Sequence, residues 1–284
     1  MKTFSKQPGT MENMEVVDCP ICSSRLVREL WDCGEFVFSS CEGCGHVYQN
    51  PRPAAGDLIE RYDGEYLSYE VDNDERFFAL MKLGLKDVRF SRIEADIKTR
   101  SSGTPRFLDI GCATGMLVRH FKDRGWDAQG VEVCTPAAEY GKTHRGVTIH
   151  IGTLETQAFP DQYFDVVHSS HVIEHVPEPG EYIAEQARIV KSQGYLIVTT
   201  PNRSSLQARW RGKNWRSAIA DHVHLFSRRH LGALLKRHGF RVVRWKTWGG
   251  APVGTASGLK KKILDRGAKV FGFGDVMIYL AQKR

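Results

Sequence analysis

The stretch 106–115, which reads RFLDIGCATG, constrains the fold of this chain more than any other. Its first half is apolar and predicts a short buried strand, and a helical pattern of apolar residues begins at Leu117. Gly111 and Gly115 lie between the two. A strand that ends on a glycine-rich turn and enters a helix brings backbone N–H groups close to a ligand, and Asp109 places a carboxylate at the same point. The stretch therefore predicts a ligand site.

Strands and helices alternate from this stretch to the end of the chain, which predicts a mostly parallel sheet covered by helices on both faces. We therefore expect an α/β fold with a Rossmann-like, seven-stranded sheet. Such sheets bind ligands at the carboxyl ends of their strands. The expected strands lie at 107–110, 128–133, 147–151, 164–168, 194–200, 240–245 and 276–281.

The glycine turn is not the Gly-x-Gly-x-x-Gly fingerprint of dinucleotide folds, and it lacks the Gly-Lys-Ser/Thr ending of a phosphate loop. Its order, Asp109-x-Gly111-x-x-x-Gly115, resembles the first motif of class I S-adenosylmethionine-dependent methyltransferases, with Ala113 in place of a middle glycine. Taken alone, the stretch is also compatible with an ordinary strand-to-helix turn. From Phe107 onward the chain resembles the group that contains the ubiquinone-type O-methyltransferases, which implies S-adenosylmethionine as the methyl donor.

The resemblance also implies which residues contact the donor. Glu132, about 20 residues after Asp109, ends the second expected strand, where an acid can accept hydrogen bonds from both ribose hydroxyls. The loop after the third strand borders the adenine in the family, and the end of the fourth strand lies over the methyl-donor pocket. The donor residues expected from the resemblance are Asp109, Gly111, Ala113, Gly115, Glu132, Thr153, Leu154, Ser170 and His171.

The segment after the fourth strand, HVIEHVP, is similar to the family's Leu/Ile-Glu-His-Val segment. His171, Glu174 and His175 fall at i, i+3 and i+4, on one side of a helical turn. Two interpretations compete: His175 is a general base or orients the acceptor, or the three side chains hold a second divalent metal, as in relatives with Glu at the first position. A structural capping role for His175 is a further alternative.

Two more histidines, His222 and His224, precede the next-to-last expected helix. Their alternation predicts that both point to the same side of an extended strand. Because a neutral imidazole can take a proton from a hydroxyl, the catalytic candidates are His175, His222 and His224. The preceding segment 203–216 mixes Arg and Lys with two Trp residues. That mixture suits an anionic, sugar or aromatic acceptor, RNA, or merely a solvated basic face.

Four cysteines near the N-terminus form two Cys-x-x-Cys pairs, Cys19 with Cys22 and Cys41 with Cys44, separated by 18 residues. This spacing is typical of a zinc site with four cysteine ligands. Four thiolates complete a tetrahedral ion and leave no open position for substrate, so the expected zinc is structural. A redox dithiol is the alternative. The cysteine spacing predicts a zinc ribbon.

The expected domain organisation is a disordered lead at 1–14, the zinc ribbon at 15–53, a helical linker or lid at 54–100 and the methyltransferase domain at 101–284. An amphipathic helix is expected over 72–99, with apolar residues on one face.

The sequence thus predicts a methyltransferase that acts on an oxygen of a small molecule or glycan precursor. No apolar run approaches the roughly 18 residues of a membrane helix, and a cytoplasmic location is expected. The net charge of +7 permits an anionic partner without requiring one. Two alternatives stand beside this prediction: an RNA methyltransferase, and a non-catalytic adaptor whose methyltransferase fold only binds ligand.

Overall fold

The computed structural model describes residues 13–54, 56–57, 64–250 and 258–284. Within these residues the chain forms a seven-stranded sheet, a four-stranded sheet and a two-stranded ribbon. All but the last two residues of the expected disordered lead lie outside the described residues. No helix in the described part of the chain is both long and apolar enough to cross a membrane.

The seven-stranded sheet has the order β12-β13-β10-β9-β6-β7-β8. Neighbours from β10 to β8 run parallel, whereas β13 is antiparallel to both β10 and β12. The predicted α/β fold with a mostly parallel seven-stranded sheet is therefore confirmed. The strands are β6 (Arg106–Ile110), β7 (Asp127–Glu132), β8 (Thr148–Ile151), β9 (Phe164–Ser170), β10 (Val190–Pro201), β12 (Phe240–Trp248) and β13 (Val276–Lys283).

Helices cover both faces of this sheet. Successive side chains of a strand point to opposite faces, so neighbouring residues of β6 contact different helices. Phe107 packs with Phe121 of α4, whereas the next residue, Leu108, packs in a separate core with Ile183 of α6 and Leu231 of α8. The helices on the Phe107 face are α2 (Gly64–Asp87), α3 (Phe90–Arg100), α4 (Met116–Asp123) and α5 (Thr135–Arg145), and α6 (Pro179–Ile189) and α8 (Arg228–Arg237) lie on the other.

The amphipathic helix expected over 72–99 is instead two helices, because the chain breaks between α2 and α3. Arg89 adopts a left-handed conformation with φ 59°. Its neighbours Val88 and Phe90 are both buried in the same core. In one continuous helix these residues would point about 200° apart. The break lets both of them reach the core.

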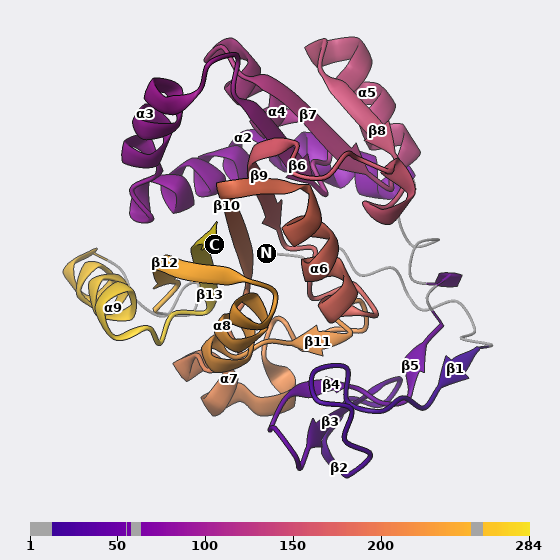
Figure 1. Ribbon diagram of the computed structural model, residues 1–284. Coiled ribbons are helices and arrows are strands. Elements are labelled where there is room, and N and C mark those ends of the chain that lie inside the picture. The colour runs from indigo at the N-terminus through magenta and orange to yellow at the C-terminus, as the bar shows by residue number, and fades with distance from the viewer. Residues whose placement is uncertain (1–12, 55, 58–63, 251–257) are drawn as a thin grey trace.

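The N-terminal segment that is predicted to form a zinc ribbon packs directly against the rest of the chain. Its strands β2 (Val27–Asp32), β3 (Val37–Cys41) and β4 (Val47–Gln49) are continued by β11 (His224–Leu225), which comes from far along the chain. Figure 1 shows these strands at one end of the molecule, beside α7 (Leu206–Arg211) and distant from β8 and α5. The core that contains Tyr48 and Cys41 also contains Phe226, so the two parts share one hydrophobic interior.

The remaining described elements are short or lie at the edges of the fold. They are β1 (Met14–Glu15), which pairs with β5 (Arg52–Pro53), the single-turn helices Glu155–Gln157 and Gly212–Asn214, and the C-terminal α9 (Gly258–Phe271).

Candidate active site

The glycine turn between β6 and α4 needs its glycines for two physical reasons. Gly111 has φ 66°, and a Cβ there would lie 2.4 Å from Val172 Cγ2. Gly115 has φ 77°, and its Cβ would lie 2.8 Å from Val147 Cγ2. Ala113 also has positive φ, 47°, which explains why glycine suits that position in the family motif. The turn therefore packs tightly against Val172, which follows β9, and against Val147, which precedes β8.

Glu132 ties the two ends of the expected donor site together. Its Oε2 accepts a hydrogen bond from Ala113 N and its Oε1 from Cys134 N, each at 2.8 Å. Burial raises the pKa of Glu132, although these backbone N–H groups oppose that rise. A carboxylate oxygen can accept more than one hydrogen bond, so the carboxylate retains capacity for ribose hydroxyls. Its contact with the donor stays a prediction.

Replacing Glu132 by Ala should weaken binding of S-adenosylmethionine about 10- to 100-fold, because hydrogen bonds to a charged group contribute roughly 1.5–3 kcal/mol. Titration calorimetry would measure this, with Glu139→Ala on the exposed part of α5 as the matched control. Donor affinity unchanged by Glu132→Ala would show that the ribose assignment is wrong.

Asp109, the acid of the first motif, is buried and lies with its Oδ1 2.7 Å from His168 Nδ1. The bond joins Asp109, the next-to-last residue of β6, to the neighbouring strand β9. Sequence reasoning did not single out His168, although a histidine within an apolar strand was a visible signal. Asp109 therefore has a structural partner in addition to its expected role at the donor.

Helix α2 brings two carboxylates, Glu70 and Asp74, to the donor turn. The sequence predicted a helical linker or lid here, without assigning a role to either carboxylate. Asp74 accepts a hydrogen bond from Thr114 Oγ1 at 2.6 Å and pairs with Arg145. Burial raises the pKa of Glu70 to about 7, and the negative charges of Glu132 and Asp74 add to the rise. The N-terminal half of α2 therefore lies beside the donor residues.

Glu70 predicts a pH dependence of stability. Because its pKa is raised to about 7 in the fold, the fold favours the protonated form. This contribution is present below the ordinary carboxyl pKa and is lost as pH rises through 7. From pH 5 to pH 8, the wild type should lose roughly 2 kcal/mol of unfolding free energy relative to Glu70→Gln. Urea denaturation of both proteins would measure it, and parallel pH profiles would contradict it.

The segment after β9 forms a single turn over the carboxyl edge of the sheet. Glu174 is fully buried, with Oε1 3.0 Å from His171 Nδ1 and Oε2 accepting from Thr200 Oγ1 at 2.9 Å. Burial would raise the pKa of Glu174, but the bond to His171 and the nearby imidazoles lower it to about 2. Glu174 is therefore a buried anion at neutral pH.

His175 and His222 meet at this anion, with ring centroids 4.8 Å apart. His175 Nδ1 lies 2.8 Å from Asp221 O, and His222 Nδ1 lies 2.9 Å from Ser217 O. Since a carbonyl only accepts, each Nδ1 carries a proton and each Nε2 is the basic atom in the neutral ring. Burial lowers the pKa of His222 to about 3, so that ring is neutral at pH 7.

The metal-ligand trio expected from spacing was His171, Glu174 and His175. The structure brings together a different set, because ligand atoms of Glu174, His175 and His222 lie within 4.8 Å of one another. Both Glu174 oxygens already accept hydrogen bonds, from His171 and Thr200. A divalent metal at this cluster stays a prediction.

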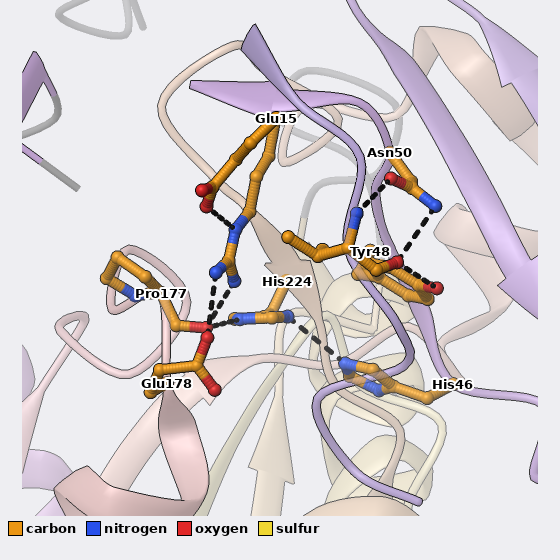
Figure 2. Close-up of polar contacts among 9 residues, drawn as sticks. Glu15, His46, Tyr48, Asn50, Pro177, Glu178 and His224 are labelled. Carbon is orange, nitrogen blue, oxygen red and sulfur yellow. Dashed lines mark hydrogen bonds and ion pairs between the residues drawn. The ribbon is translucent and has the colours of Figure 1, made fainter. Parts of the chain in front are cut away.

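His224 has hydrogen-bond partners different from those of His222, although both rings lie against the turn after β9, and a shared role at the acceptor stays a prediction. Only His224–Leu225 is strand, and the chain before it turns, with His222 N donating to Ile219 O at 3.2 Å. His224 Nε2 lies 3.2 Å from Pro177 O, and its Nδ1 lies 3.3 Å from His46 Nε2 (Figure 2). Burial lowers the pKa of His224 to about 4, so its ring is neutral at pH 7.

The other expected donor residues lie at the carboxyl ends of the strands. Ser170 ends β9, and His171 N donates to Thr199 O at 2.9 Å. Thr153 O accepts from Gln157 Nε2 at 3.0 Å, and Leu154 is buried in the core. Their contacts with adenine and the methyl donor stay predictions.

The cysteines fit a zinc ion. Sγ atoms of Cys19 and Cys44 lie 3.7 Å apart, those of Cys22 and Cys41 lie 3.5 Å apart, and all four lie within 4.8 Å of one another. Tetrahedral zinc with Zn–S bonds of about 2.3 Å requires sulfurs about 3.8 Å apart. The cluster suggests the expected structural zinc site.

Comparison with known proteins connects this geometry to a family. A family profile described as a methyltransferase domain matches residues 80–244, which is more than half of the chain. The ubiquinone biosynthesis O-methyltransferase of Nitrosomonas europaea is 31% identical over 103 residues, covering 34% of this chain and 44% of that protein. The protein of the same name from Burkholderia lata is 33% identical over 106 residues, covering 35% and 45%. The chain thus matches about half the length of these curated relatives.

Solved structures share the fold. An S-adenosylmethionine-dependent methyltransferase from Thermotoga maritima superposes with a TM-score of 0.52 at 24% identity, covering 76% of this chain and 97% of that one. One from Archaeoglobus fulgidus gives a TM-score of 0.50 at 20% identity, covering 73% and 99%. With the profile match, the strand order and the glycine turn in agreement, the chain belongs to the class I S-adenosylmethionine-dependent methyltransferases.

Proposed function

We propose that this protein is a cytoplasmic enzyme that transfers a methyl group from S-adenosylmethionine to an oxygen of a small molecule or glycan precursor. The observation that carries the proposal is the glycine turn, closed by Glu132 and covered by the turn that bears His175. The names of the curated relatives support oxygen as the acceptor atom.

The chain's own residues would align the reactants and accept a proton. When bound, S-adenosylmethionine supplies a methyl group activated by a sulfonium. The Asp221 carbonyl fixes the tautomer of His175, which leaves Nε2 as the atom that takes the proton of the acceptor hydroxyl. The buried Glu174 carboxylate stabilises positive charge on the imidazoles around it. Alignment and exclusion of water supply most of the remaining rate enhancement.

The surface near this turn favours an acceptor with negative charge. Arg203 follows Thr200 by three residues and stacks over Trp31 of the ribbon, 4.5 Å from the ring centre. Its buried Nε has no hydrogen-bond partner among the described residues. Burial lowers the pKa of Arg203, and the charge of Arg209 adds to this. A phosphate or carboxylate on the acceptor would pair with the outer Nη groups of this guanidinium, since Nε itself is inaccessible.

Titration of the zinc-loaded protein with S-adenosylmethionine and with S-adenosylhomocysteine tests the proposal first. Binding near micromolar Kd is expected, followed by methyl transfer to phosphorylated or acidic glycan precursors. Failure of a folded sample to bind either compound would favour a non-catalytic adaptor. Salt-sensitive binding and methylation of RNA, without turnover of small acceptors, would favour an RNA methyltransferase.

A further inference from the structure

A buried arginine joins the zinc ribbon to the turn that carries His175. The side chain of Arg52, in β5, is only 5% exposed. Its Nε donates to Glu15 Oε1 at 2.8 Å, Nη2 to Glu178 Oε1 at 2.7 Å and Nη1 to Pro177 O at 2.6 Å. A buried guanidinium with these partners is strongly restrained, because leaving its charge unpaired would be costly. Arg52 therefore fixes the end of the segment 171–178.

A pair of histidines reaches the same carbonyl from another direction. Figure 2 shows the Pro177 carbonyl oxygen facing His224, with His46 on the far side of that ring. Because Pro177 O only accepts, His224 Nε2 carries the proton and its Nδ1 accepts from His46 Nε2. Each hydrogen bond of the pair therefore has its donor on the ribbon side and its acceptor on the side of the turn.

The zinc knuckle fixes the ribbon end of this pair. His46 lies two residues after Cys44, and its carbonyl accepts from Cys41 N at 2.9 Å. On the other side, His224 N donates to Glu174 O at 3.0 Å. The chain of contacts therefore begins at a cysteine of the knuckle and ends on the residue before His175.

The donor residues have partners elsewhere. Glu132 is held by Ala113 and Cys134, and Asp109 is held by His168. These partners all belong to the methyltransferase domain. The expected donor residue His171 begins the turn 171–178, whereas the contacts of Arg52 and His224 reach its later part, at Glu174, Pro177 and Glu178.

We propose that Arg52 and the His46–His224 pair are positioning residues, through which the zinc ribbon sets the conformation of the turn 171–178 and thereby controls turnover rather than donor binding. The inference rests on the proposed function only in taking His175 to act at the acceptor. It goes beyond a structural role for the zinc, because it predicts separate effects on turnover and on donor affinity.

A matched pair of variants tests the proposal. Arg237, on α8, also joins the methyltransferase domain to the ribbon, because its Nη1 donates to Ile21 O at 2.6 Å. Ile21 belongs to the zinc knuckle, so this contact does not involve the turn 171–178. In Arg52→Ala, kcat should fall about 10- to 100-fold, as expected for losing hydrogen bonds of a charged group. Zinc content and the Kd for S-adenosylmethionine should stay within twofold. Arg237→Ala should leave kcat within threefold.

Amide hydrogen exchange gives a readout that does not need turnover. Exchange in 171–178 should be faster in Arg52→Ala and unchanged in Arg237→Ala. If Arg52→Ala does not fold, Arg52→Lys is the second variant. Lysine keeps the charge but cannot bond to all three acceptors at once, so kcat should fall and exchange in 171–178 should rise, each by less than in Arg52→Ala. Equal kcat and equal exchange in the two alanine variants would overturn the proposal. If exchange in 171–178 is faster in Arg52→Ala but the wild type methylates no acceptor, the ribbon does control the turn and the proposed function is wrong.

Discussion

Cys41→Ser should release the zinc and lower the free energy of unfolding of the whole chain by about 5 kcal/mol or more, because the binding energy of a structural zinc is largely folding energy. Cys41 is buried, and its Sγ lies 3.5 Å from that of Cys22. The effect should not stay within the ribbon, because Cys41 belongs to the same core as Phe226 and Leu231. Strand β11 also depends on β4 for its pairing.

Metal analysis and thermal unfolding of the purified protein would measure this effect. Cys33→Ser is the matched control, because Cys33 lies in the same segment but outside the four-cysteine cluster. The control should keep about one zinc per chain and unfold within a few degrees of wild type. A fully zinc-loaded Cys41→Ser protein would show that the assigned ligand set is wrong.

His175→Ala should reduce kcat by about 10²- to 10⁴-fold, the usual range for removal of a general base. Affinity for S-adenosylmethionine should change little, since the closing contacts of the donor turn come from Glu132. The split between kcat and donor Kd follows from the position of His175 on the turn after β9, where its Nδ1 is held by Asp221 O.

The pH profile of kcat separates a base from a merely structural residue. The rise of kcat with pH that reflects deprotonation of the base should be present in the wild type and absent in His175→Ala. His144→Ala on the exposed face of α5 provides a control for loss of an imidazole elsewhere. A variant that loses donor affinity in proportion to kcat would contradict a role at the acceptor.

The sequence determined those features that are encoded over a few residues. The apolar run, the glycines and Asp109 predicted the donor turn, because a strand, a left-handed turn and a helix each leave a local pattern. Alternation of strands and helices predicted the parallel sheet, and the cysteine spacing predicted a cluster whose sulfurs lie together in the fold.

Only the tertiary structure decided which distant residues share a site. It placed Glu70 and Asp74 beside the donor turn, whereas the sequence predicted only that they lie in a helical linker or lid. It gave His222 and His224 different hydrogen-bond partners, and it brought His46 to His224 from 178 residues away. Such contacts leave no periodicity, since they depend on how sheet and ribbon pack. Local patterns therefore specified the elements, and burial of a shared core specified which side chains meet.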